Sequence, residues 1–124
     1  EPLMAEGGVL MTMSYYGAEK VVDRYNLMGP VKAALEASVR YMATELGPQG
    51  IRVYALSPGP VPTRAASGID RFDELMEAAA VRAPRHALVT LDQVGALAAF
   101  LASDKATGMT GNVVYVDNGY NIRG

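Results

Sequence analysis

A tyrosine and a lysine seven residues apart, Tyr25 and Lys32, are the side chains of this sequence best suited to chemistry. If the run that joins them is helical, seven residues are about two turns and roughly 10 Å of axial rise, so both side chains project from one face. The phenol can then reach a substrate while the nearby cation holds a cofactor and eases the phenol towards ionisation. The same spacing is common on amphipathic helices without a function, so the surrounding sequence must decide.

The elements that must position this pair alternate between strand and helix. Strands are predicted at residues 9–13, 51–56 and 112–116, and helices at residues 26–46, 71–81 and 92–101. The first strand is a continuous apolar run, as a buried parallel strand requires, and the first helix has apolar residues at three- and four-residue steps. This alternation predicts an α/β fold with parallel pairing and right-handed crossovers.

The predicted boundaries follow from local chemistry. Gly47 and Pro48 end the first helix, and Pro30 is tolerated if it lies in the first turn, where a missing backbone N–H costs little. The prolines of residues 57–60 are expected to end the second strand, because proline cannot donate to a ladder. Asp92 is a plausible N-cap for the last helix. Asn118 is expected to tolerate a positive φ in the closing turn.

Composition excludes several classes of function. The chain has 124 residues, of which 50% are hydrophobic and 19% charged, so it is one globular domain or part of one. A net charge of -2 leaves no basic surface for nucleic acid. No apolar run approaches the roughly 20 residues of a membrane span. Without cysteine, and with His86 as the single histidine, no metal site is expected, and a reducing cytoplasm is a compatible compartment.

The glycines lack the spacing that cradles a dinucleotide phosphate. Thirteen glycines are present, yet none of them form Gly-x-Gly-x-x-Gly or Gly-x-x-x-Gly-x-Gly. A complete doubly wound domain also needs far more chain than three strands and their helices. We therefore expect residues 1–124 to be the C-terminal part of a single Rossmann-like domain, with the N-terminal cofactor-binding half absent.

Six motifs closely resemble the enoyl-acyl-carrier-protein reductases of bacterial fatty-acid synthesis, the FabI type within the short-chain dehydrogenase/reductase superfamily. The motifs are residues 14–20, 25–29, 32–38, 39–43, 57–60 and 65–69. Carbonyl-reducing members of that superfamily place their tyrosine four residues before the lysine, where this chain has Met28. Tyr16 and Lys20 do have that spacing, but the small-residue helix that follows the family lysine begins at Lys32, so Lys20 is interpreted as a loop charge.

The resemblance implies a role for each matching residue. Tyr25 matches the tyrosine that hydrogen-bonds the substrate oxygen, Lys32 the lysine that binds the nicotinamide ribose, and Tyr15 a tyrosine of the substrate pocket. The segment around the cofactor is matched by Gly59, Pro60, Val61 and Thr63. Ala65 and Ala66 match the mobile loop that covers the substrate.

The implied activity is reduction of the trans-2 double bond of an enoyl-acyl-carrier-protein thioester by NADH. The resemblance further implies a cytoplasmic homotetramer without metal, membrane or nucleic acid, and this half alone is expected to be inactive. Two alternatives stay open at this point. One is another oxidoreductase of the superfamily, and the other is a non-catalytic half-domain that pairs with a partner chain through an exposed sheet edge.

Overall fold

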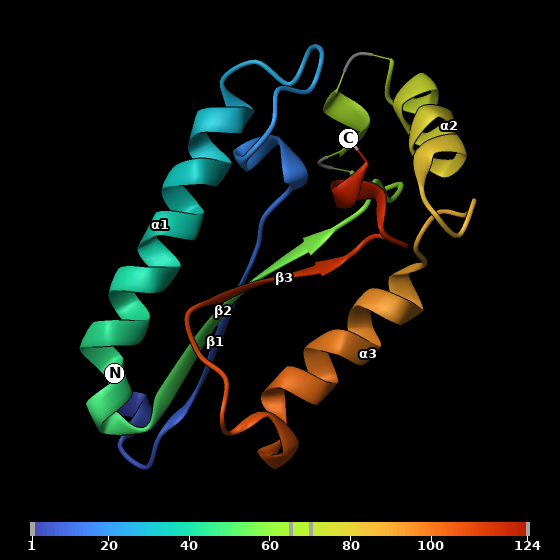
Figure 1. Ribbon diagram of the computed structural model, residues 1–124. Helices are drawn as coiled ribbons and strands as arrows, with labels where there is room; N and C mark the ends of the chain where they lie inside the picture. The colour runs from blue at the N-terminus through green and yellow to red at the C-terminus, as the bar shows by residue number, and fades with distance from the viewer. Residues whose placement is uncertain (1, 65, 70, 124) are drawn as a thin grey trace.

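Three parallel strands form the centre of the computed structural model, which describes residues 2–64, 66–69 and 71–123. The sheet order is β1 (Gly8–Met13), β2 (Ile51–Pro58) and β3 (Asn112–Val116). Figure 1 shows α1 (Met28–Leu46) along one face of the sheet and α3 (Leu91–Ala102) along the other. The chain thus has the predicted Rossmann-like arrangement of a parallel sheet with flanking helices.

The central strand β2 divides its side chains between the two helices. Ile51, Val53 and Ala55 pack with Val39 and Ala43 of α1. On the other face, two alternate residues of β2 pack against α3 and the segments that flank it; this core contains Tyr54, Leu56, Val89, Val94 and Leu101. Alternation with a period of two, buried on both sides, is what a strand covered by a helix on each face requires.

The carboxyl ends of all three strands point to one end of the molecule (Figure 1). The loop of residues 14–27, the helix α2 (Phe72–Arg82) and the terminal turn η6 (Tyr120–Ile122) gather there. In open α/β sheets, ligands bind beyond this edge. Within the described ranges, no helix combines the length and the apolarity that crossing a membrane requires.

The first helix begins later than the sequence indicates. Its first residue is Met28, so Tyr25 lies in the preceding loop and the assumption of a helical run from Tyr25 to Lys32 is wrong. The reason is local: Arg24 and Asn26 have φ values of 64° and 53°, a left-handed conformation that an α-helix cannot contain. Pro30 lies in the first turn, where it was expected to be tolerated.

Two other boundaries also differ from the prediction. The second strand does not stop before its first proline: β2 continues to Pro58, which is paired with Val116 of β3. The N-cap of α3 is Thr90 rather than Asp92, because the Thr90 hydroxyl accepts from the Gln93 amide and the Gln93 side chain accepts from the Thr90 amide. The third strand has the predicted bounds, and Asn118 has the predicted positive φ, 55°.

A fully buried tyrosine of the sheet leads to a stability prediction. Tyr54 is fully buried; its hydroxyl donates to the Met109 carbonyl at 2.6 Å and accepts from Arg52 at 2.8 Å. We expect Tyr54→Phe to lower the free energy of unfolding by about 1–3 kcal/mol, because both partners lose a buried hydrogen bond. Tyr41→Phe is the control, since Tyr41 is 79% exposed. Denaturant unfolding measures both, and equal stabilities would contradict the prediction.

Candidate functional site

A cluster of buried tyrosines lies beyond the carboxyl ends of the strands. Its aromatic members are Tyr15, Tyr16, Tyr25 and Tyr120, and Ala79 and Ala83 at the end of α2 close it. The ring centroids of Tyr15 and Tyr25 are 5.1 Å apart, with 60° between the ring planes. The structure therefore brings together the two tyrosines that the sequence assigns to the substrate.

Tyr25 is held in place by a glycine that sequence reasoning did not single out. A Cβ added to Gly17 would stand 2.6 Å from Cδ2 of the Tyr25 ring, closer than real contacts allow. Gly29 in the first turn of α1 is similarly close to this segment, because its added Cβ would lie 3.1 Å from the Gly17 carbonyl oxygen. Two glycines thus let the short helix η2 (Tyr16–Ala18) and α1 approach closely, with the Tyr25 ring against them.

Burial shifts the pKa of both tyrosines. It raises the pKa of the Tyr25 phenol above its ordinary value of 10, and no neighbouring charge lowers it. The pKa of Tyr15 is raised as well, first by burial and then by the surrounding phenols and Asp117. The expectation that a nearby cation eases the Tyr25 phenol towards ionisation is therefore not met, and both groups are neutral hydrogen-bond donors near neutral pH.

The Tyr15 hydroxyl has an unused hydrogen-bonding capacity. It is buried and makes no hydrogen bond with any described residue. The Tyr25 side chain is also buried, and none of the described residues hydrogen-bonds its hydroxyl. A buried donor without a partner is costly unless a ligand or water satisfies it, so the Tyr15 hydroxyl marks a place for a bound group, and Tyr25 lines the hollow beside it.

Lys32 lies in α1 and reaches the end of the first strand. Its Nζ donates to the Met13 carbonyl at 2.8 Å. An ammonium has three protons, so two donors remain for a ligand beside the carboxyl end of β1. Lys20, by contrast, contacts the body of the protein, since its Nζ donates to the Asn121 carbonyl and lies 5.6 Å from the centre of the Tyr16 ring.

The segment that follows β2 is held in place by contacts with the end of β3. Gly59 donates its amide to the Val116 carbonyl, and a Cβ on Gly59 would lie 3.2 Å from Cβ of Asp117. Asp117 is itself held, because its carboxylate accepts from the amides of Gly119 and Asn121. Sequence reasoning missed Asp117, whose only signal is its place before the turn at Asn118.

The other residues predicted to contact the cofactor or the substrate loop lie in the segment after Gly59. Pro60 is buried and Val61 packs against the core on the α3 face. Thr63 is exposed, and its hydroxyl oxygen accepts from the Ala66 amide at 3.1 Å, which leaves its proton available as a donor. Ala66 begins the short helix η4 (Ala66–Gly68), whereas Ala65 lies outside the described residues. Thr63 and Ala66 thus belong to one local turn.

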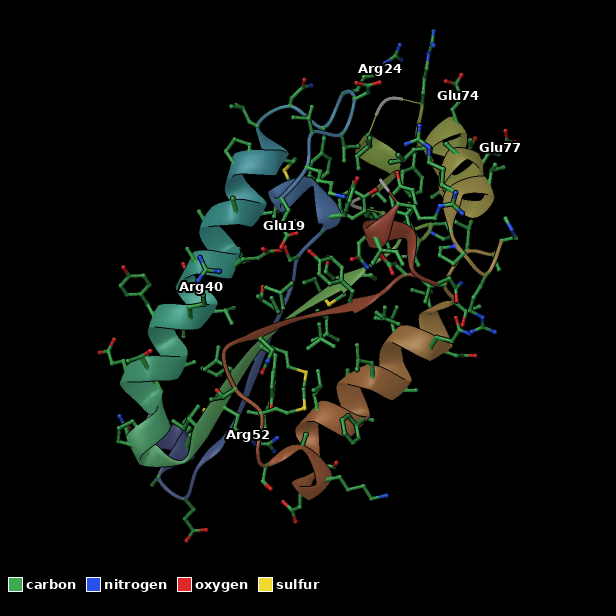
Figure 2. All side chains as sticks on the ribbon, in the orientation of Figure 1. Glu19, Arg24, Arg40, Arg52, Glu74 and Glu77 are labelled. Atoms are coloured by element: carbon green, nitrogen blue, oxygen red, sulfur yellow. The ribbon has the colours of Figure 1, made fainter. Side chains whose placement is uncertain are left out.

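Two hollows flank the loop that carries Tyr25. One, of about 530 Å³, is lined by Tyr25 and by the first turn of α1 at Gly29 and Pro30. The other, of about 420 Å³, lies between the loop and α2, where Arg24 and Glu74 stand at the same end of the molecule (Figure 2). Neither hollow is lined by Lys32 or Gly59, so the structure places the predicted cofactor residues apart from these cavities.

Metal ligands do not gather at this end. Among residues 2–64, 66–69 and 71–123, no three side chains of His, Asp or Glu stand close enough together to hold an ion. His86 is exposed and has a positive φ of 48°. The polar groups that the structure brings to the site include phenols, the Lys32 ammonium and backbone groups.

A parallel α/β sheet with tyrosines, a lysine and a glycine turn beyond its carboxyl edge fits the Rossmann-like fold of the short-chain dehydrogenase/reductase superfamily. The chain belongs to the enoyl-(acyl carrier protein) reductase family, whose model matches residues 1–121. A relative from Rickettsia felis, named enoyl-[acyl-carrier-protein] reductase [NADH] FabI, is 50% identical over 124 residues, and one of the same name from Nostoc is 52% identical over 124 residues.

Solved structures agree with this assignment. The Bacillus cereus enoyl-acyl carrier protein reductase, in complex with NADP+ and indole naphthyridinone, superimposes with a TM-score of 0.95 at 47% identity, over 99% of this chain and 48% of that one. The Anaplasma phagocytophilum reductase in complex with NAD gives 0.92 at 53% identity, over 99% and 47%. The chain spans about half the length of the curated relatives it matches: the Rickettsia and Nostoc matches cover 100% of this chain and 48% of each relative.

The contact between Gly17 and Tyr25 leads to a second prediction. We expect Gly17→Ala to lower the free energy of unfolding by about 1–3 kcal/mol, because the new methyl group forces the Tyr25 ring or the α1 contact to shift. The near-ultraviolet circular dichroism of the tyrosines should change with it. Gly95→Ala in α3 is the control, since its methyl group would meet nothing within 4 Å. An unchanged tyrosine spectrum in Gly17→Ala would show that the close contact does not hold the ring.

Proposed function

We propose that residues 1–124 form the substrate-facing half of an NADH-dependent enoyl-acyl-carrier-protein reductase. The observation that carries this proposal is the pair Tyr15 and Tyr25, two buried phenols in ring contact whose hydroxyls have no described partner, next to the strand end that Lys32 reaches. Family membership supports it, because the relatives carry the name of this reductase.

The residues present are suited to one end of a nicotinamide cofactor. Lys32 has two donors left after its bond to Met13, which suits the two hydroxyls of a ribose. Gly59 lets Asp117 pack closely against its backbone, since an added Cβ would lie 3.2 Å from Cβ of Asp117, so residues 59–61 are held at a fixed place beside β3. Thr63 keeps a hydroxyl proton for a phosphate oxygen. We therefore assign Lys32, Gly59, Pro60, Val61 and Thr63 to the cofactor, as the sequence predicted.

The chemistry divides between the cofactor and the tyrosines. NADH supplies a hydride for the β-carbon of a trans-2-enoyl thioester, and a proton completes the reduction at the α-carbon. Negative charge develops on the thioester oxygen, and Tyr25 is assigned as the donor that stabilises it. The raised pKa of Tyr25 supports this role, since a phenol that stays neutral can donate a hydrogen bond to that oxygen. Tyr15, Ala65 and Ala66 are assigned to the acyl chain.

The assembly is proposed to be a homotetramer that works in the cytoplasm. The outward side of α1 exposes Val31, Tyr41 and Met42, and β3 is at an edge of the described sheet. Exposed apolar side chains on a helix and an open strand edge are features that a partner subunit can cover. Apart from these subunits and the acyl-carrier-protein substrate, the proposal includes no metal, membrane or nucleic acid.

The direct test uses a full-length protein made by joining residues 1–124 to the part of the Rickettsia felis relative that the match does not cover. We expect this chimera to oxidise NADH with crotonyl thioester and not with simple ketones, and the chain alone to be inactive, because its sequence has no phosphate-cradling turn. Turnover of ketones only would favour another oxidoreductase of the superfamily. A folded chimera without either activity would refute the proposed function.

Tyr25→Phe tests the assigned donor. In the chimera we expect kcat to fall by about 100-fold, because the developing charge loses its hydrogen bond, while the Kd of NADH changes by less than about twofold. Stopped-flow absorbance of NADH and a fluorescence titration measure the two quantities. Tyr41→Phe on the exposed side of α1 is the matched control. Unchanged turnover would remove Tyr25 from the mechanism.

Lys32→Ala tests the assigned cofactor contact. We expect the Kd of NADH to rise by about ten- to a hundredfold, as expected for the loss of one or two charged hydrogen bonds. Lys105→Ala is the control, because Lys105 is an exposed lysine of the turn after α3. Fluorescence titration gives both affinities, and a normal NADH affinity in Lys32→Ala would count against its role.

A further inference from the structure

The side of the sheet that faces α1 is mostly apolar, but its last row of residues, at the carboxyl edge, is polar. Apolar residues cover most of this side, among them Leu10, Val53, Ala55 and Val113. Thr12 already brings a hydroxyl to the row of Ala55 and Val113, and the last row carries hydroxyl groups at all three positions: Ser14, Ser57 and Tyr115. The pairing register joins Ser57 to Tyr115, and the Ser14 amide donates to the Leu56 carbonyl, which continues the pairing of β1 with β2. A row of three hydroxyls thus lies under α1 at the carboxyl edge.

One buried carboxylate of α1 meets this row. Glu36 is 5% exposed, and its Oε1 accepts from the Ser14 hydroxyl at 2.6 Å. This length is typical of a hydroxyl that donates to an ionised carboxylate, one of the stronger hydrogen bonds in proteins. The Ser57 hydroxyl is buried and has no partner in the described part of the chain, and the buried Tyr115 hydroxyl lies near the Glu19 carboxylate, which is outside α1. The bond from Ser14 to Glu36 is therefore the polar link that ties this row to α1.

The link lies beside the candidate site. Lys32 precedes Glu36 by one helical turn, and its Nζ holds the carbonyl of Met13, the residue before Ser14. Two adjacent residues of the strand end are thus bound by two residues one turn apart on α1. Within the described residues no ion pair joins Lys32 to Glu36, so the carboxylate acts on the strand end rather than on the ammonium.

The backbone of Glu36 is itself held by Arg40, which lies one turn further along α1. Arg40, labelled on α1 in Figure 2, donates from Nη1 to the backbone carbonyl of Glu36 at 3.2 Å. On the strand side, Tyr15 follows Ser14 directly, and its ring contacts Tyr25. A shift of the strand end would therefore move Lys32's acceptor and the tyrosine pair together.

We propose that Glu36 is a positioning residue: by accepting the hydrogen bond of Ser14 it fixes the end of β1 against α1, and so places Lys32 and Tyr15 for their ligands. The inference rests on the proposed function for its ligands, while the Ser14–Glu36 contact is a feature of the chain itself. The role depends on the length of the Glu36 side chain, here called its reach, more than on its charge. The reason is that the hydrogen bond must span from the helix to the strand.

Two substitutions of Glu36 separate reach from charge in the chimera. Glu36→Gln keeps the length and an acceptor oxygen, and we expect the Kd of NADH to stay within about twofold. Glu36→Asp keeps the charge but is one methylene shorter, and we expect a rise of about tenfold, the change that corresponds to one lost hydrogen bond. Ser14→Ala should match Glu36→Asp, and the double variant should be no worse than either, because both remove one shared bond.

Hydrogen–deuterium exchange supplies a readout that needs neither NADH nor turnover. In Ser14→Ala and Glu36→Asp the amides of residues 14–18 should exchange faster, whereas those of β2 should not change. Ser38→Ala is the matched control, because it removes a hydroxyl from the exposed side of the same helix, where it bonds only the Ala34 carbonyl. If Ser14→Ala does not fold, the comparison of Glu36→Gln with Glu36→Asp decides alone.

The outcomes distinguish the two proposals. Parent-like NADH affinity and exchange in Glu36→Asp would overturn the positioning role, even if the chimera is an active reductase. A weaker NADH affinity in Glu36→Gln than in Glu36→Asp would also overturn it, since charge rather than reach would then matter. If the parent chimera reduces no enoyl thioester, the proposed function fails, and the exchange of residues 14–18 still tests the Ser14–Glu36 bond.

Discussion

The contact between the end of β1 and the first turns of α1 is the constraint on which the rest of the site depends. Met13 and Ser14 are bound there by Lys32 and Glu36, and the backbone of η2 then runs against Gly29. Because the strand is held in the sheet and the helix is held on the apolar core below, this junction has little freedom to move. Tyr15 follows Ser14 directly and its ring contacts Tyr25, so the position of the tyrosine pair depends on this junction.

Around this junction, some buried polar groups lack a hydrogen-bond partner among the described residues. Tyr15 and Ser57 each have a buried hydroxyl without a described partner, and burial raises the pKa of Tyr15 and of Tyr115. Such groups reduce stability unless water or a ligand satisfies them, and they gather at the edge where α/β sheets bind ligands. The well-paired hydroxyl of Tyr54, at the other end of the sheet, shows that the same fold can satisfy a buried phenol fully.

The pattern of elements was predictable because it depends on periodicities that are local in the sequence. The third strand has the expected bounds, and the parallel sheet between helices was expected from the alternation of elements. The errors occur where a single residue decides. Left-handed backbone at Arg24 and Asn26 delays α1, Thr90 rather than Asp92 caps α3, and β2 continues to Pro58. Hydrophobic periodicity carries no information about such positions.

The sequence by itself determined the fold class, the family resemblance and the candidate residues Tyr25 and Lys32, since residue types and spacings are sufficient for each. Only the tertiary structure decided how these residues are held. The fit of Tyr25 against Gly17, the bond from Ser14 to Glu36 and the support of Gly59 by Asp117 join residues that are 8, 22 and 58 positions apart. The upward shift of the phenol pKa values was also decided there, because burial depends on what surrounds a group in space, and no spacing along the chain records it.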